Sequence, residues 1–217
     1  MPLPRDNMFF GLAAKMTDEQ RKYVDSIFDR QLTIVNARSG TGKTTLAVAA
    51  AKLLGRPLVY VFSPVEEGRM GFRPCTQREK ESAYITPLTD ALYEIGENPA
   101  RAIYDPDNAE AQKRGDVWVY PMSHVFARGM NLKGKTVVIS EAQNFTRGEL
   151  KKILTRIHDD CTVIIEGHTK QCDLPNAAKS GFAPYIEHFR NEPYAAVCEL
   201  TVNFRGVLAQ KADTLSW

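Results

Sequence analysis

Residues 36–45 read Asn36-Ala37-Arg38-Ser39-Gly40-Thr41-Gly42-Lys43-Thr44-Thr45. They follow an apolar run, Leu-Thr-Ile-Val at 32–35, and precede a run of small and apolar residues at 46–51. The first run is typical of a buried strand, and the second favours a helix. A glycine-rich loop between a strand and a helix, closed by Lys-Thr, predicts a phosphate-binding loop.

The residue types in this loop suit a chain of phosphates. Gly40 and Gly42 allow positive φ, which turns successive N–H groups inward, and the helix that follows directs its positive end at the same anion. We expect Lys43 to reach the β- and γ-phosphates and Thr44 to offer its hydroxyl to Mg²⁺. The other loop residues expected to contact the nucleotide are Ser39, Thr41 and Thr45.

One position departs from the usual loop pattern, G-x-x-x-x-G-K-[ST], because its first glycine is Ala37 here. Alanine adopts ordinary strand φ and ψ, so we expect this variant to be tolerated. The alternative is a turn of similar composition that binds no phosphate. The order of strand, loop, Lys-Thr and helix argues against that alternative.

The whole chain has the composition of a globular domain. Its 217 residues are 43% hydrophobic and 25% charged, with a net charge of +2, which suits one sizeable core. We therefore expect a single domain over residues 1–217, with an irregular segment at 1–15 and a loop or insertion at 94–115. A near-neutral total neither requires nor excludes nucleic acid. Basic residues that alternate with acidic ones favour a solvated surface instead: Arg69, Arg73, Arg78 and Lys80.

The cysteines and the apolar runs indicate a compartment. Four cysteines are scattered without a C-x-x-C pair, which argues against a zinc ribbon and against a disulfide framework. No run is long enough to span a membrane, and the apolar residues 8–14 are too few for a signal peptide. These features predict a cytoplasmic protein with no membrane partner.

Further apolar runs, separated by helix-length stretches, predict a mostly parallel sheet. They occupy residues 58–62, 117–120, 136–139, 162–165 and 196–202, with helical patterns after residue 17, from residue 87 and at 146–154. Parallel strands joined by crossover helices form a three-layer α/β domain. Thr17 and Gln20 have the spacing of a capping box, which predicts the start of the first helix.

Ligands of such a sheet gather at the carboxyl ends of its strands, so the residues after each run are candidates. One run ends in Ser140-Glu141-Ala142-Gln143-Asn144, and the next ends in Glu166-Gly167-His168-Thr169-Lys170-Gln171. Glu141 is placed to take a proton from the water that attacks a γ-phosphate, with Glu166 as the alternative carboxylate. The amides of Gln143 and Gln171 are placed to sense that phosphate.

These motifs together resemble the PhoH family of P-loop ATPases. The likeness rests on G-T-G-K-T at 40–44, G-F-R-P at 71–74, S-E-A-Q-N at 140–144 and G-x-x-x-Q-x-D-L-P at 167–175. It covers residues 17–210 and implies a domain similar to the RecA-like domain of superfamily 1 helicases. It also implies ATP hydrolysis with Mg²⁺, action on or alongside RNA, and a homo-oligomer such as a hexameric ring.

The resemblance assigns roles to individual residues. By it, Gln20 reads the adenine, Glu141 is the catalytic carboxylate, and Gln143 and Gln171 are sensors. Arg156 and Arg205 are similar to positions where the family carries arginines, and both are expected to be catalytic. On the residues alone, Gln20 could equally be a capping residue only, and Arg156 a solvated helix residue.

Two departures from the family pattern bear on hydrolysis. Where the family usually has D-E-A-Q and G-D-x-x-Q, the two aspartates are Ser140 and His168 here. Ser140 is then expected to touch Mg²⁺ through water, without the formal charge that stabilises a cation best. A slowly hydrolysing, nucleotide-gated binding module is therefore an alternative. A small-molecule P-loop kinase is a third, disfavoured because no lid of paired arginines is recognisable.

Overall fold

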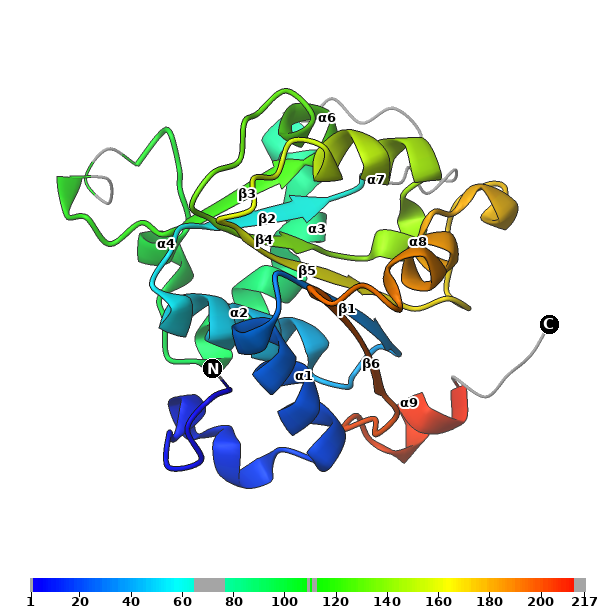
Figure 1. Ribbon diagram of the computed structural model, residues 1–217. Helices are drawn as coiled ribbons and strands as arrows, with labels where there is room; N and C mark the ends of the chain where they lie inside the picture. Colours follow the sequence, from blue (N-terminus) through cyan, green and yellow to red (C-terminus); the bar gives the residue numbers. More distant parts are fainter. Residues whose placement is uncertain (1, 65–76, 109, 111–112, 213–217) are drawn as a thin grey trace.

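A central sheet of six strands organises the protein. The computed structural model describes residues 2–64, 77–108, 110 and 113–212. Within them every neighbouring pair of strands is parallel (Figure 1). The strands are β1 (Leu32–Ala37), β2 (Leu58–Phe62), β3 (Val119–Ser123), β4 (Thr136–Ile139), β5 (Thr162–Gly167) and β6 (Ala195–Leu200). The predicted α/β class with a parallel sheet is confirmed.

The order of the strands decides which chain segments meet. Across the sheet the strands run β3-β2-β4-β5-β1-β6. β5 therefore lies between β1 and β4, and Ile165 is opposite both Ile34 and Ile139. Because parallel strands end at the same edge, the segments that follow β1, β4 and β5 lie side by side.

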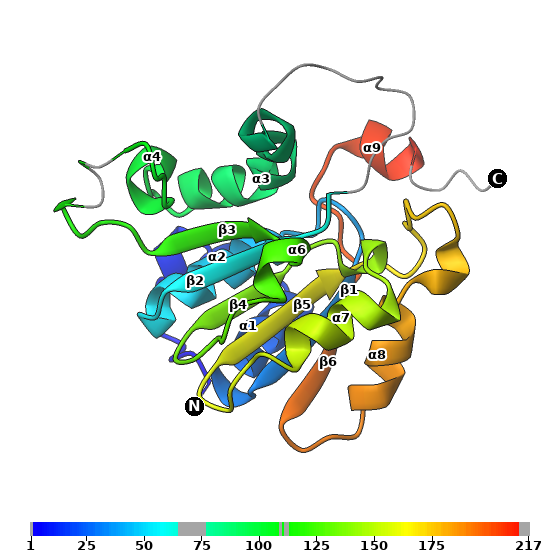
Figure 2. The same cartoon turned by 90° about the horizontal axis from the view of Figure 1, so that it is seen from above.

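Helices cover both faces of the sheet (Figure 2). One face carries α1 (Asp18–Asp29), α2 (Lys43–Leu54) and α3 (Gln77–Glu94), and the other carries α6 (His124–Ala127), α7 (Arg147–Leu154) and α8 (Phe182–Phe189). Each face of the sheet has its own hydrophobic core, and successive strand residues point to opposite faces. Tyr60 therefore packs with α1–α3, whereas Val61 packs with α6–α8. Burial on both faces explains why the strands read as continuous apolar runs.

The amino-terminal segment is part of the core on the α1 face. It contains two short 3₁₀ turns, η1 (Phe9–Gly11) and η2 (Ala13–Lys15), and buries Leu3 and Phe9. The predicted capping box at α1 is present: the Gln20 N–H donates to the Thr17 hydroxyl at 3.2 Å, and the Thr17 N–H donates to Gln20 Oε1 at 3.0 Å. This pair fixes the start of α1.

Some elements lie where the sequence did not predict them. α3 begins at Gln77, well before residue 87, and contains Pro87, because packing of Leu88 and Leu92 into the core outweighs the donor that proline lacks. β3 extends to Ser123, since pairing with β2 includes Pro121. Residues 94–115 hold a capped helical turn, α4 (Pro99–Ala102). The remaining short elements are η3 (Ala142–Asn144), η4 (Ala177–Lys179) and α9 (Val207–Ala212).

Part of the predicted pattern falls outside the described residues. The G-F-R-P motif at 71–74 lies there, as do Arg69 and the side chains of Arg78 and Lys80. In the part of the chain that is described, no helix combines the length and the apolar character needed to cross a membrane.

Candidate nucleotide site

The phosphate loop has the predicted geometry. β1 ends at Ala37, and α2 begins at Lys43 after a loop in which Gly40 and Gly42 have φ of +81° and +79°. These angles are in the left-handed region that favours glycine. Ala37 is still in the strand, opposite Leu200 of β6, so its side chain causes no conflict. The loop and the amino end of α2 thus form an anion-binding cradle.

Gln20 connects α1 to this loop. Its Nε2 donates to the Thr41 carbonyl oxygen at 2.9 Å, while its Oε1 serves the capping box. The Thr41 hydroxyl donates to the Arg38 carbonyl at 3.0 Å. Ser39 and Thr45 flank these contacts and are half-buried. In this structure the Gln20 amide stabilises the loop, and its predicted role in reading adenine stays a prediction.

Lys43 meets the carboxylate that follows β4. Lys43 is 7% exposed, and its Nζ lies 3.6 Å from Glu141 Oε1. Glu141 has φ 52° and ψ 47°, a left-handed conformation that costs a non-glycine residue about 1–2 kcal/mol. The strained backbone aims the carboxylate across β5 at the loop. The sequence alone predicted both residues but not their contact.

Gln143 holds this carboxylate in place. It is 2% exposed, and its Nε2 donates to Glu141 Oε2 at 2.5 Å. Its Oε1 accepts from the His168 N–H at 3.0 Å, which ties the segment after β4 to the segment after β5. Gly167 makes room for this amide, because a Cβ there would lie 2.8 Å from Gln143 Oε1. Both ends of the amide are therefore used within the protein.

The hydroxyl of Thr44 is bonded to a second carboxylate, Glu166, at the end of β5. Thr44 Oγ1 donates to Glu166 Oε2 at 2.7 Å. Glu166 is 0% exposed, and among the described residues no group donates to its Oε1. Burial raises the pKa of Glu166 to about 7, against the lowering effects of Lys43 and the Thr44 hydroxyl, and Glu141 raises the pKa further.

Ser140 lies beside Glu166. β4 and β5 pair through Ile139 and Ile165. The residues that follow these two, Ser140 and Glu166, therefore lie side by side. Ser140 is 2% exposed, and its side chain hydrogen-bonds to Tyr60 from β2. Burial raises the pKa of Tyr60 far above its usual range, and the bond from Ser140 opposes this. The hydroxyl that was expected to face Mg²⁺ thus has a protein partner.

The segment after β6 folds back over the phosphate loop. The Glu19 carboxylate of α1 accepts from the N–H and the hydroxyl of Thr201 at 2.7 and 2.8 Å. The Phe204 N–H then donates to the Gly40 carbonyl at 2.8 Å. The side chain of Arg205 follows closely, since a Cβ on Gly40 would be 2.8 Å from its Cγ. Arg205 therefore lies at the loop.

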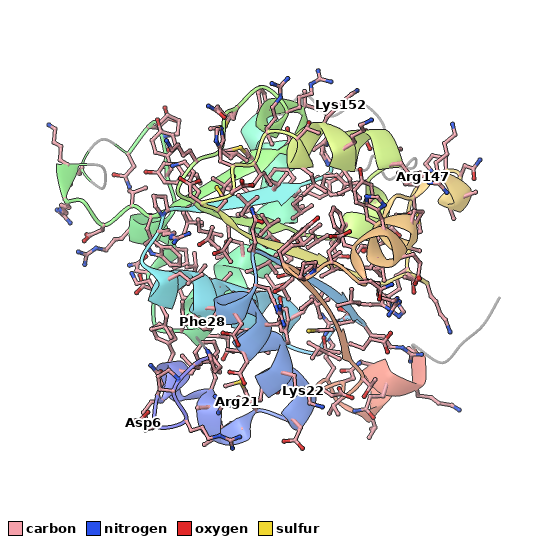
Figure 3. The ribbon with its side chains drawn as sticks, in the orientation of Figure 1. Asp6, Arg21, Lys22, Phe28, Arg147 and Lys152 are labelled. Carbon is pink, nitrogen blue, oxygen red and sulfur yellow. The ribbon has the colours of Figure 1, made fainter. Side chains whose placement is uncertain are left out.

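Arg156 lies near the amino ends of the strands, at the opposite end of the sheet from the phosphate loop. α7 starts at Arg147 near the carboxyl ends of the strands and runs away from them past Lys152 (Figure 3). Beyond α7 the Arg156 carbonyl accepts from the Leu132 N–H at 2.9 Å, just before β4 begins. Within one chain, Arg156 is thus separated from the phosphate loop by the length of the strands. The signal for this was available in the sequence, because a helix that joins two parallel strands returns the chain to their amino ends.

Gln171 and a cleft complete the carboxyl edge. Gln171 is half-buried in the turn after β5, where its N–H donates to the His168 carbonyl at 3.2 Å. A cleft of about 330 Å³ opens beside the phosphate loop. Its lining comes from the ends of β1, β5 and β6: Asn36, Arg38, His168, Glu199, Leu200 and Thr201. Among the described residues no three His, Cys, Asp or Glu side chains form a metal site by themselves.

Three contacts at this edge were missed from the sequence. They are the bond from Thr44 to Glu166, the bond pair from Thr201 to Glu19, and a reciprocal pair of 2.8 Å bonds between Asn144 and Asp173. Asn144 and Asp173 belong to two of the quoted motifs, S-E-A-Q-N and Q-x-D-L-P. Because each residue belongs to one of the quoted motifs, these motifs were the signal in the sequence that could have indicated the contact.

Solved structures with a similar fold are helicase and terminase proteins. The large terminase of the thermophilic bacteriophage D6E matches with a TM-score of 0.55 at 11% identity, over 91% of this chain and 49% of that chain. The same terminase in complex with ADP matches with a TM-score of 0.51. The UvsW helicase of bacteriophage T4 matches with a TM-score of 0.50 at 10% identity, over 84% of this chain and 59% of that one. The expected RecA-like fold is confirmed.

Curated relatives share clearer sequence identity. Over 76% of this chain, the sequence is 37% identical to a PhoH-like protein of Synechocystis. It is 34% identical to a PhoH-like protein of Bacillus subtilis over 83% of this chain, and 29% identical to Protein PhoH of Escherichia coli over 90% of this chain. These matches cover 49%, 56% and 55% of the relatives, so the chain spans about half their length. The pattern that defines PhoH-like proteins matches residues 13–212, and the chain therefore belongs to the PhoH-like protein family.

Proposed function

We propose that the protein binds ATP at the phosphate loop and hydrolyses it with Mg²⁺. The family, the fold and the loop support a nucleotide-binding ATPase of the P-loop kind. The observation that carries the proposal is the 3.6 Å contact between the Lys43 ammonium and the Glu141 carboxylate. It brings together the expected phosphate-binding cation, at the start of α2, and a candidate general base, in the segment after β4. The ADP complex of the terminase with a similar fold supports a nucleotide as the ligand.

The residues at the site fit the steps of such a reaction. Lys43 and the amino end of α2 would bind the β- and γ-phosphates. A phosphate that pairs with Lys43 would free the Glu141 carboxylate from the ammonium, so that the carboxylate could orient a water and take its proton. Gln143 keeps the carboxylate in position through its 2.5 Å bond. Thr44 would ligate Mg²⁺, which supplies neutralising charge at the phosphate oxygens.

We further propose that ATP drives a motor or switch that acts on or alongside RNA, as a homo-oligomer in the cytoplasm. Apolar side chains near the phosphate loop support assembly, because Phe204 is 57% exposed and Val207 and Leu208 are each 83% exposed. Arg205 lies at the loop of its own chain, whereas Arg156 is available only to a neighbouring copy. In a ring, Arg156 would act as a catalytic arginine at the site of the neighbouring copy.

Titration calorimetry on the Lys43→Ala variant tests the site. The substitution removes a buried cation, so ATP affinity should fall by more than about tenfold, since a charge-assisted contact contributes roughly 1.5–3 kcal/mol. Wild-type affinity in this variant would mean that the loop is not the site.

A second candidate, a slowly hydrolysing binding module, is favoured by the bond that occupies Ser140. Multiple-turnover assays with and without RNA separate it from an RNA-stimulated ATPase. Thin-layer analysis of phosphate transfer to nucleosides tests for a kinase.

A further inference from the structure

Glu166 is a buried carboxylate with one oxygen used and one unused. Its Oε2 accepts the Thr44 hydroxyl at 2.7 Å, and its Oε1 receives no hydrogen bond within the described residues. Buried polar atoms are nearly always satisfied, and an unpaired carboxylate oxygen at 0% exposure is especially costly. The unused oxygen indicates a donor that joins the site with a ligand.

The position of this oxygen suits the water shell of a cation. Thr44 is the loop residue expected to ligate a divalent cation, and its hydroxyl hydrogen is already donated to Glu166. Its lone pairs are therefore left for a metal. A carboxylate bonded to the metal-ligating hydroxyl is well placed to accept from metal-bound waters. Lys43 and Glu141 are the charged side chains that act on Glu166, so one ammonium faces two carboxylates, and an added cation improves the balance.

Ser140 does not supply this carboxylate. Its side chain carries no charge, and its hydroxyl bonds to Tyr60. The register places Ser140 and Glu166 side by side at the ends of β4 and β5. β5 also lies between β4 and the strand that leads into the phosphate loop. A carboxylate on β5 thus starts one strand closer to Thr44.

We propose that Glu166 holds the water shell of the divalent cation that accompanies the nucleotide, and that the neighbouring Ser140 does not. This inference rests on the proposed function, because the cation is brought by the nucleotide.

The test measures how strongly Mg²⁺ and ADP reinforce each other's binding. Calorimetric ADP affinities are compared in excess Mg²⁺ and in EDTA for the parent and for Glu166→Gln, an isosteric change. We expect the variant to keep its affinity in EDTA and to lose about tenfold or more of the Mg²⁺-dependent gain, because a charged acceptor is lost. Thermal melting provides a second readout: without ligand the variant should melt higher, since a buried charge is gone, and Mg-ADP should stabilise it less.

Two further variants make the test specific. Ser140→Ala should change the Mg²⁺-dependent gain by no more than about twofold. The double variant Ser140→Asp/Glu166→Gln, which moves the carboxylate from β5 to β4, should recover most of the gain. Ser140→Asp alone places two carboxylates side by side and should lower the melting temperature.

The outcomes are distinguishable. If the parent does not bind ADP, the proposed function is wrong. If the parent binds ADP and Glu166→Gln keeps the full Mg²⁺-dependent gain, or if Ser140→Ala loses it, the proposed function stands and the assignment of Glu166 is overturned.

Discussion

Glu141 is held in a strained conformation by contacts on two sides, from Lys43 and Gln143. Glu141→Gln keeps the shape of the side chain but cannot accept a proton from water. We expect an unchanged ATP dissociation constant and a turnover number lower by about a hundredfold or more. Calorimetry and phosphate release measure the two quantities. Undiminished turnover would require another general base.

At the scale of secondary-structure elements, the contact between α1 and the segment after β6 holds Arg205 at the phosphate loop. Glu19→Ala removes both bonds to Thr201, so residues 201–205 should detach more often from the phosphate loop. We expect faster hydrogen exchange at the Phe204 N–H and an ATP affinity weaker by a few fold, since each lost bond contributes about 1 kcal/mol.

Asp18→Ala is the matched control for Glu19→Ala. Both residues are acidic and lie in the first turn of α1, so both changes remove the same favourable charge near the helix amino end. Only Glu19 reaches Thr201. Equal exchange rates at Phe204 in the two variants would show that the contact does not hold the segment.

The packing of α6 against α7 should make stability depend on pH. His124 lies 3.4 Å from Glu149, against Phe145, with Arg128 and Lys152 nearby. Burial lowers the pKa of His124, although Glu149 opposes this effect. A lowered histidine pKa stabilises the fold above the unfolded value of about 6.5, and this contribution is lost as the pH falls through the folded value.

The His124→Gln variant isolates this effect. Unfolding free energies of parent and variant should diverge as the pH falls below about 6.5, because only the parent must protonate a buried ring. Glu166 contributes in the opposite direction, because its raised pKa of about 7 makes the fold lose stability as the pH rises through that value. Parent and variant share this contribution, so it drops out when the unfolding free energy of the variant is subtracted from that of the parent. Denaturation curves between pH 5 and 8 measure this difference, and a constant difference would contradict the prediction.

At the scale of the whole molecule, the prediction concerns assembly. Mass measurement in solution should find an oligomer that is stabilised by Mg-ATP, because the exposed apolar side chains near the loop need a partner. Leu208→Asp should weaken assembly without lowering the melting temperature. Leu53→Asp, on a 39% exposed residue at the far end of α2, serves as the control. A monomer under both conditions would exclude the ring.

The sequence by itself determined the elements and the phosphate loop. The glycines, Lys43 and Thr44 follow one strand and precede one helix, so their chemistry is encoded within ten neighbouring residues. The capping box at Thr17 and the parallel α/β class were also predicted, because periodicity and capping are local properties. Where packing outweighed local preference, as at Pro87 inside α3, the prediction was wrong.

Only the tertiary structure decided which side chains share the site. Strand order and register bring Thr44 to Glu166, 122 residues away in the chain, and direct Ser140 to Tyr60. The fold-back after β6 brings Arg205 onto the phosphate loop. Sequence spacing fixes positions within an element, but the placement of one strand beside another depends on how all the buried faces pack together.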